Sequence, residues 1–418
     1  MRVYMETYGC SANQAESEIM AGILKKAGFV LSSEDDCDIT IINSCIVKEP
    51  TEQKLLYRIN QIRGGLIIAG CAPEVIYKKI TDVAPSASLV STHHITRIAE
   101  VAQGVQKGKR LEFLGDLREI KLDLPRIRKN PVIGIVQIAS GCNSSCSYCC
   151  VRPLKGSLNS YPKEQIIKEV STAVNSGCKE IWLTSQDNSC YGFDSGGNLP
   201  DLLNAISQIN GKFRVRVGMM NPRNLLKRDF LDSLIKSYGS EKIYKFLHLP
   251  VQSGSDNVLK KMRRGYTAED YKSIVSIFRT KFPTLQLWTD VIAGFPGETD
   301  RDFLSTVDLL KKVRPDFVNI SKYGARENAP SSKMKQLPTE IKKERSAAIT
   351  RLAKEISFEK NTECICWEGV AFITEKKKNG RLGRNFAYKP ITLDTGKIGE
   401  FVKVKILDEN LDGKCLLS

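Results

Sequence analysis

The first part of the chain alternates between two patterns of apolar positions. Short runs rich in Val, Ile and Tyr are typical of strands, and the stretches between them repeat their apolar residues roughly every three to four positions, as one-sided helices do. The runs lie at residues 1–8, 38–45, 65–71 and 86–92, each followed by a helical stretch. Strands joined in this way lie parallel, with right-handed connections. Residues 1–125 are therefore expected to form an open parallel α/β domain.

The alternation resumes after a polar, proline-bearing stretch at residues 122–131, which we interpret as a linker. Helical stretches separate six expected strands, at residues 132–140, 180–186, 213–220, 244–252, 285–294 and 316–324. This pattern predicts a partial or complete (β/α) barrel at residues 131–357.

The last part of the chain has a different character. Residues 358–418 contain short β-rich runs separated by turns with Gly and Asn. This pattern fits a small antiparallel β-barrel of the oligonucleotide-binding kind. The predicted fold class is therefore α/β, with an N-terminal parallel domain, a TIM-like barrel and a C-terminal β domain.

The composition describes a well-packed chain that carries positive charge. Of its 418 residues 41% are hydrophobic, which excludes a wholly disordered chain. Apolar runs stay far below the roughly 18–20 residues needed to span a bilayer, and the first residues lack the apolar stretch of a secretory signal, so a cytoplasmic protein is expected. Lys and Arg number 63 against 47 Asp and Glu, giving a net charge of +16 that favours a polyanionic partner.

Thirteen cysteines but only three histidines point to thiolate chemistry. Cys142, Cys146 and Cys149 form a C-x3-C-x2-C spacing on a polar loop directly after an expected strand. Three soft thiolates suit an iron–sulfur cluster, in which a fourth iron would keep an open coordination position. The alternatives are a zinc site, for which no second cysteine pair follows at the usual spacing, a fourth ligand in Cys150, and simple packing of buried thiols.

Three further cysteines follow the ends of expected strands in the first domain. Cys10, Cys45 and Cys71 are far apart in sequence. In an open parallel sheet the carboxyl ends of neighbouring strands share one edge, where ligands bind. The three thiols can therefore converge on a second three-thiolate cluster, and scattered core cysteines are the alternative.

The central cysteine loop resembles that of radical S-adenosylmethionine enzymes. The resemblance rests on the C-x3-C-x2-C spacing with the aromatic Tyr148 before the last cysteine, and on DVIAGFPGET at residues 290–299, which is similar to the cofactor-binding strand of that superfamily. It implies that the open iron chelates S-adenosylmethionine, and that reductive cleavage of this cofactor yields a 5′-deoxyadenosyl radical.

The whole chain also resembles the radical S-adenosylmethionine methylthiotransferase family. The family pattern YGCxxNxxES, NSC and AGC is matched at residues 8–17, 43–45 and 69–71, and the C-terminal β domain looks like a TRAM domain. The resemblance implies two 4Fe–4S clusters, an auxiliary cluster on Cys10, Cys45 and Cys71 and a radical-generating cluster on Cys142, Cys146 and Cys149. It also implies that one S-adenosylmethionine methylates a sulfur on the auxiliary cluster, while another supplies the radical that abstracts the C2 hydrogen of an adenine.

Polar residues at the ends of the barrel strands are candidates for cofactor or substrate contacts. Together with Tyr148 they are Gln186, Asp187, Arg216, Gln252, Ser253 and Asp290. For each of them alone, capping a loop or satisfying the core is an equal alternative. No catalytic residue is assigned beyond the six cluster ligands. Where family members commonly carry Arg-Gly after the cysteine loop, this chain has Lys155 and Gly156, so a phosphate or cofactor contact there is not carried over.

Family members act on an adenosine of tRNA or on an aspartate of a ribosomal protein. The net charge of +16 and a basic segment at residues 374–389 favour tRNA. The candidates for RNA contact are Lys376, Lys377, Lys378, Arg381 and Arg384, with Phe386 and Tyr388 beside them for base stacking. A solvated basic hairpin is the alternative.

Three stretches of the chain resemble the archaeal and eukaryotic branch that acts on N6-threonylcarbamoyladenosine. They are LTSQDNSCYG, LHLPVQSGSDNVLKKMRRGYT and KYGARENAPSSKMKQLP. The expected activity is therefore 2-methylthiolation of that nucleoside, next to the anticodon. The alternatives are the isopentenyladenosine-specific branch and a non-catalytic iron–sulfur protein that binds RNA. We also expect a flavodoxin- or ferredoxin-like electron donor and a sulfur donor as partners, a monomer, and no membrane attachment.

Overall fold

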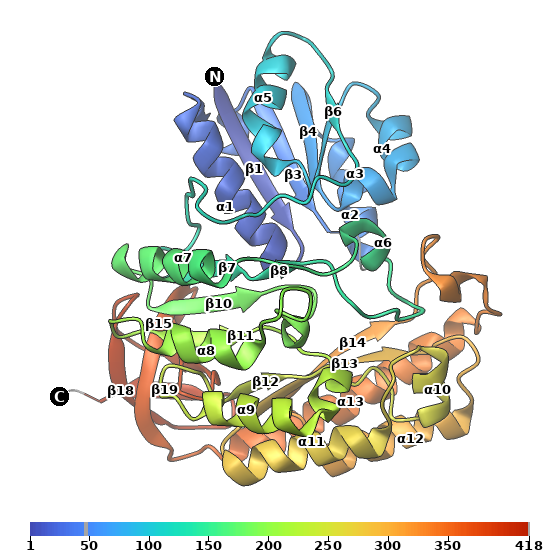
Figure 1. Cartoon of the computed structure of the whole chain (residues 1–418), viewed down its shortest axis with the longest axis vertical. Helices are drawn as coiled ribbons and strands as arrows, with labels where there is room; N and C mark the ends of the chain where they lie inside the picture. Colours follow the sequence, from blue (N-terminus) through green and yellow to red (C-terminus); the bar gives the residue numbers. More distant parts are fainter. Residues whose placement is uncertain (46–48, 417–418) are drawn as a thin grey trace. The chain divides into compact units, whose positions relative to one another are not determined.

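The computed structural model of the chain describes residues 1–45 and 49–416 (Figure 1). Its packing divides the chain into two compact units. The first unit comprises Met1–Lys129, Ile135–Cys142 and Cys150–Glu169, and the second comprises Asn130–Gly134, Asn143–Cys149 and Val170–Ser418. The expected domain bounds of 1–125, 131–357 and 358–418 remain predictions. In the described part of the chain, no helix has both the length and the apolar character that crossing a membrane requires.

A parallel six-stranded sheet forms the centre of the first unit, in the order β2-β1-β3-β4-β5-β6. Its strands are β1 (Arg2–Tyr8), β2 (Val30–Leu31), β3 (Ile39–Ser44), β4 (Gly65–Gly70), β5 (Ser88–Ser91) and β6 (Glu112–Phe113). The helices of this unit are α1 (Ser11–Lys26), α2 (Glu49–Ile59), α3 (Ala72–Val75), α4 (Tyr77–Val83), α5 (Ile98–Gln106) and α6 (Arg152–Lys155), with the 3-10 helices η1 (Glu34–Asp36) and η2 (Ile95–Arg97). The short strands β8 (Ala139–Ser140) and β9 (Asn159–Ser160) pair antiparallel. The expected open parallel α/β architecture is confirmed.

Helices cover both faces of this sheet (Figure 1). Side chains alternate between the faces of a strand, so Ile41 packs with α1 and α5, whereas the next residue, Ile42, packs with α2, α3 and α4. Both faces are apolar, as expected for parallel strands that helices bury on two sides.

The stretch interpreted from sequence as a linker is packed against α1 over residues 122–129. Arg126 forms an ion pair of 2.8 Å with Glu169, and the Ile127 amide donates to the Glu18 carbonyl at 2.9 Å. A Cβ on Gly22 of α1 would lie 2.4 Å from the backbone of Pro125. The polar composition of this stretch therefore reflects paired charges rather than a solvated connection.

The second unit contains the strands and helices of the predicted barrel. Its strands are β10 (Glu180–Thr184), β11 (Arg214–Val217), β12 (Phe246–His248), β13 (Gln286–Ala293) and β14 (Phe317–Lys322), whereas β7 (Ile133–Gln137) and α7 (Lys163–Asn175) have residues in both units. The helices are α8 (Leu199–Ser207), α9 (Arg228–Tyr238), α10 (Asp256–Lys261), α11 (Ala268–Lys281), α12 (Asp300–Val313) and α13 (Thr339–Thr362), with the 3-10 helices η3 (Asn188–Cys190), η4 (Pro222–Leu226) and η5 (Pro330–Lys333). β10 pairs with β11, and β12, β13 and β14 pair in sequence order, all in parallel. All six expected strands are present.

The C-terminal strands of the second unit close into a barrel in the order β15-β16-β17-β19-β18. They are β15 (Glu368–Lys377), β16 (Gly380–Arg384), β17 (Pro390–Leu393), β18 (Phe401–Ile406) and β19 (Asp412–Cys415). The expected small β-barrel is confirmed, with one difference: β17 and β19 pair in parallel, because the chain crosses the barrel between them through β18.

Candidate active site

The structure brings Cys10, Cys45 and Cys71 to one edge of the sheet in the first unit. The register pairs Tyr8 of β1 with Ser44 of β3, and Ser44 with Gly70 of β4, so these three strands end side by side. One or two residues later each strand reaches its cysteine. The Cys45 amide donates to the Tyr8 carbonyl at 2.7 Å, and the Cys71 amide to the Ser44 carbonyl at 3.0 Å.

Glycines allow the backbone to pack closely around these cysteines. A Cβ on Gly9 would lie 2.6 Å from the Cβ of Cys45, and a Cβ on Gly70 would lie 2.2 Å from Asn43 Oδ1. Both glycines have a positive φ, which side chains disfavour. The Cys10 thiol donates to Asn13 Oδ1 at 3.3 Å. The edge therefore has no room for larger residues beside the three thiols.

The donor set at this edge consists of cysteine thiols, the ligands that hold iron–sulfur clusters. Among the described residues, no group of three or more His, Cys, Asp and Glu side chains is arranged to hold one metal ion. A cubane gives each thiolate an iron of its own, so its thiolates lie farther apart than those around one ion. Burial raises the pKa of Cys71 to about 12, and a metal that binds this thiol displaces its proton.

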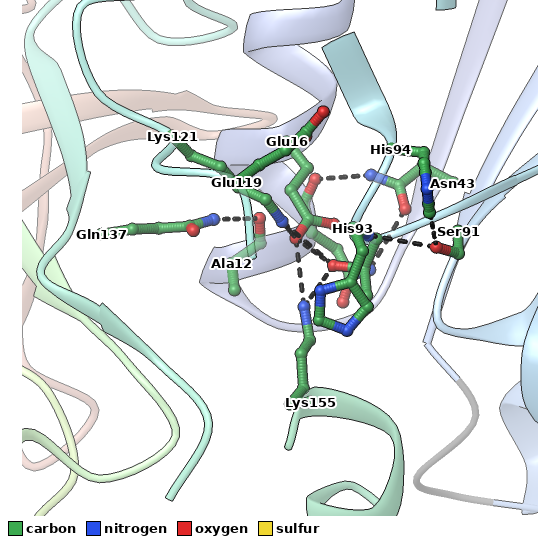
Figure 2. Close-up of polar contacts among 12 residues, drawn as sticks. Ala12, Glu16, Asn43, Ser91, His93, His94, Glu119, Lys121, Gln137 and Lys155 are labelled. Carbon is green, nitrogen blue, oxygen red and sulfur yellow. Dashed lines mark hydrogen bonds and ion pairs between the residues drawn. The ribbon is translucent and has the colours of Figure 1, made fainter. Parts of the chain in front are cut away.

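A buried network of charged side chains lies in the same unit (Figure 2). Glu16 of α1 is 0% exposed and accepts hydrogen bonds from Lys121 Nζ at 2.5 Å, Lys155 Nζ at 3.2 Å and Thr92 Oγ1 at 2.6 Å. Lys155 also donates to Thr92. Burial opposes the charge of Glu16, but Lys121 and Lys155 outweigh it and lower the pKa of this carboxyl to about 2.

The segment that follows the central cysteine loop is held within the first unit. His93 Nε2 lies 2.9 Å from the carbonyl of Leu154, and Cys150 and Leu154 are buried in the apolar cluster that contains Cys71. This burial favours a core role for Cys150 over that of a fourth ligand. Cys142 is anchored by its amide, which donates to the Gly156 carbonyl at 3.4 Å.

In the second unit, Arg264 holds the part of the loop that carries Cys146 and Tyr148. Its guanidinium donates to Cys146 Sγ and to the Tyr148 hydroxyl, both at 3.2 Å, and to the Pro250 carbonyl at 3.1 Å. Positive φ angles at Arg263 and Gly265 turn the chain on either side of Arg264. The sequence interpretation missed this residue, although it lies in the stretch 247–267 that carries the family resemblance.

Three of the predicted contact residues keep side-chain groups available. Oε1 of Gln186, like the hydroxyl of Ser185 beside it, is buried without a hydrogen-bond partner in the part of the chain that the structure describes. Arg216 faces the ring of Phe246 at 5.2 Å. Asp290 is half-buried, with an Oδ1 3.4 Å from His248 Nε2, and sequence reasoning had not singled out this histidine. Orphaned buried oxygens at the end of β10 fit a polar ligand in this barrel.

The other three predicted contact residues are engaged by the chain itself. Asp187 accepts from the amides of Ser189 and Asn221 at 3.0 and 3.1 Å and caps η3. Ser253 is 0% exposed and lies 3.2 Å from the Thr306 hydroxyl. Gln252 pairs through its backbone with β13. These contacts favour positioning roles, and the ligand contacts of all seven predicted residues, Tyr148 included, remain predictions.

The basic hairpin between β15 and β16 separates into exposed and buried residues. Lys376, Lys377 and Lys378 are exposed, and Arg381 Nε donates to the Gly396 carbonyl at 3.1 Å. Arg384 is mostly buried, with its guanidinium 4.2 Å from the ring of Tyr388.

The aromatic residues of the hairpin differ in the same way. Tyr388 is 3% exposed and packs against Tyr244 and Phe246 of the second unit, with ring centroids 5.1 and 4.9 Å apart. The expected base stacking on Tyr388 is therefore wrong, because its ring fastens the small barrel to the strands around β12. Phe386 is half-buried beside Trp367, at 6.3 Å.

Comparisons with known proteins define the class. The Radical SAM superfamily matches residues 136–310, and Uncharacterized protein family UPF0004 matches residues 2–92. The radical S-adenosylmethionine methyltransferase TsrM from Kitasatospora setae shares the fold, with a TM-score of 0.57 over 79% of this chain and 75% of that chain, at 13% identity. The cobalamin-dependent radical enzyme OxsB gives a TM-score of 0.55 over 85% and 56%, at 11% identity. The fold is that of a radical S-adenosylmethionine enzyme, which confirms the expected partial barrel.

Relatives that match along almost the whole chain narrow the class to a family. A probable threonylcarbamoyladenosine tRNA methylthiotransferase from Methanothermobacter thermautotrophicus is 43% identical, over 98% of this chain and 97% of its own. The one from Pyrococcus abyssi is also 43% identical, over 96% and 95%. The human threonylcarbamoyladenosine tRNA methylthiotransferase is 36% identical over 84% of this chain and 62% of its own. The chain belongs to this methylthiotransferase family, and as a radical enzyme it uses S-adenosylmethionine and 4Fe–4S clusters.

Proposed function

We propose that the chain converts N6-threonylcarbamoyladenosine of tRNA, next to the anticodon, to its 2-methylthio derivative. The observation that carries this proposal is the alignment of Cys10, Cys45 and Cys71 at one sheet edge, in a chain that matches threonylcarbamoyladenosine tRNA methylthiotransferases along almost its whole length. A second set of thiolates is needed only if the enzyme does more than generate a radical. The full-length match favours this substrate over isopentenyladenosine.

The six cysteines divide between two clusters in this proposal. Cys10, Cys45 and Cys71 hold the auxiliary cluster, and Cys142, Cys146 and Cys149 hold the radical-generating one. When bound, the clusters and S-adenosylmethionine supply the sulfur, the methyl group and the radical. Arg264 keeps Cys146 oriented by its hydrogen bond and fixes Tyr148 beside it. Ser185 and Gln186 offer buried acceptors for polar groups of the cofactor or the base.

The intact C-x3-C-x2-C spacing argues against the non-catalytic alternative, because a purely structural cluster needs no open iron. A low-potential electron donor of the flavodoxin or ferredoxin type and a sulfur donor complete the reaction. We further propose that the protein acts as a monomer in the cytoplasm.

The direct test is the nucleoside content of tRNA. Incubation of the reconstituted full chain with S-adenosylmethionine, dithionite and tRNA that contains N6-threonylcarbamoyladenosine should yield the 2-methylthio derivative in mass spectra of digested nucleosides. Matched tRNA that carries isopentenyladenosine should stay unchanged. Product from the second tRNA alone would show that the enzyme acts on isopentenyladenosine instead. Product from neither tRNA would refute the proposed methylthiotransferase activity.

The exposed lysines of the hairpin make a separate prediction about RNA affinity. Replacing Lys376, Lys377 and Lys378 by alanine should weaken tRNA binding and flatten the plot of log Kd against log salt by about two to three units, because each phosphate contact contributes about 0.9. Fluorescence anisotropy over a salt series measures both quantities. The matched control removes the exposed Lys311, Lys312 and Lys354 from α12 and α13. Equal slopes for the two triple variants would show that the hairpin is not the RNA contact.

A further inference from the structure

Lys155 presents a buried positive charge within the first unit. Its side chain is 6% exposed, and its ammonium donates to Thr92 and to Glu16, the latter at 3.2 Å. Figure 2 shows Lys121 and Lys155 both pointing toward Glu16. The two ammonium groups therefore share the Glu16 carboxylate. Glu119 acts on Lys121 as a further negative charge, so Lys155 is the ammonium that has to share its carboxylate with a second, better compensated cation.

The residues that contact this ammonium lie close in the fold to the cysteines of the sheet edge. The Thr92 amide donates at 2.9 Å to the carbonyl of Gly70, the residue before Cys71. Glu16 belongs to α1, which begins directly after Cys10. Leu154, the residue before Lys155, is buried in the same apolar cluster as Cys71. The ammonium of Lys155 is thus held in the part of the first unit that carries Cys10 and Cys71.

A purely structural role does not account for the burial of the Lys155 ammonium. Lys121 already neutralises Glu16 at 2.5 Å, so a second buried ammonium adds a desolvation cost without a carboxylate of its own. The Leu154 carbonyl, which His93 holds at 2.9 Å, attaches α6 without it. An anion close to Lys155 would supply the missing compensation. Three thiolates on an oxidised cubane leave about one net negative charge, and one-electron reduction adds another.

We infer that Lys155 is a positioning residue whose ammonium compensates the negative charge of the auxiliary cluster and raises its reduction potential. The inference rests on the proposed assignment of Cys10, Cys45 and Cys71 as ligands. Net charge and burial are two of the factors that set the potential of such clusters. A fixed cation stabilises the reduced form more than the oxidised form, because the reduced form carries the larger negative charge.

The test measures the auxiliary cluster alone in the full chain. A background variant with Cys142→Ala, Cys146→Ala and Cys149→Ala is reconstituted, and its midpoint potential is determined by dithionite titration followed by electron paramagnetic resonance. In this background Lys155→Gln should shift the potential to more negative values, whereas Lys155→Arg should restore it. The matched control is Lys121→Gln, which removes the other ammonium of the same network and should shift the potential less.

Each outcome distinguishes an electrostatic effect of Lys155 on the cluster from a purely structural role of its side chain. Equal potentials for Lys155→Gln and its parent, or an equal shift in Lys121→Gln, would overturn the inference. If Lys155→Gln loads no cluster, an unchanged Tm of the metal-free chain together with loading of Lys155→Arg supports it, and any other combination overturns it. If the background variant itself binds no iron, the ligand assignment in the proposed function fails, and the inference fails with it.

Discussion

Replacing Cys71 by alanine is expected to lower the iron content of the reconstituted chain from about eight to about four atoms, since each 4Fe–4S cluster contributes four. The same variant should form no 2-methylthio product, because the auxiliary cluster loses one of its three thiolates. Cys71 is the deepest of the three thiols, so water or buffer thiols cannot readily replace it. Iron and sulfide analysis and nucleoside mass spectrometry check the two expectations.

Cys150→Ala is the matched control, since Cys150 is buried in the same apolar cluster as Cys71. It should retain about eight irons and full product formation if it only fills the core. Loss of iron in Cys150→Ala would instead support Cys150 as a fourth cluster ligand. Retention of eight irons in Cys71→Ala would remove that residue from the cluster.

Replacing Glu16 by alanine should destabilise the chain by about 3–5 kcal/mol, because two buried ammonium groups lose the carboxylate that both of them contact. Urea unfolding of the full chain, followed by circular dichroism, measures this cost. The control is Glu100→Ala, which removes an exposed partner of Arg97 and should cost less than about 1 kcal/mol. A similar small cost for both variants would contradict a stabilising role of the network.

The charge of Glu16 also makes the free energy of unfolding depend on pH. The pKa of Glu16 is lowered from its ordinary value of 4.5 to about 2, with burial opposing the shift and Lys121 and Lys155 causing it. The stability that its charged form contributes is present above 4.5 and is lost as the pH falls toward 2. Glu16→Ala should lack this part of the acid dependence.

The sequence predicts the parts of the fold that rest on strong local patterns. β3 and β4 are buried along almost their whole length, and β1 has the apolar residues Val3, Tyr4 and Met5. Each of the three leads into a cysteine, so both the sheet and the shared edge follow from the alternation and the strand ends. The two-residue strands β2 and β6 have no such pattern, because their place depends on neighbours already in the sheet. The parallel pair β17–β19 depends likewise on closure of the barrel.

The buried charges could not be predicted in this way. Lysine and arginine are solvated by default, so nothing local marks Lys155, Arg264 or Arg384 as buried. Each has a partner that is distant in sequence: Glu16, Cys146 and Glu180 respectively. Glu16 stands six residues after Cys10 in the motif YGCSANQAES, but nothing in that motif indicates its burial or its two lysine partners.

The return of Cys150–Glu169 to the first unit limits how this protein could be cut and recombined. Cys150 and Leu154 fill one apolar cluster of that unit, and Lys155 completes its charged network. A fragment ending near residue 125 would lack Cys150 and Leu154, so the apolar cluster would be incompletely packed and exposed to water. The N-terminal sheet is therefore not an independent module. A chimaera that joins it to another barrel has to include the segment Cys150–Glu169 as well.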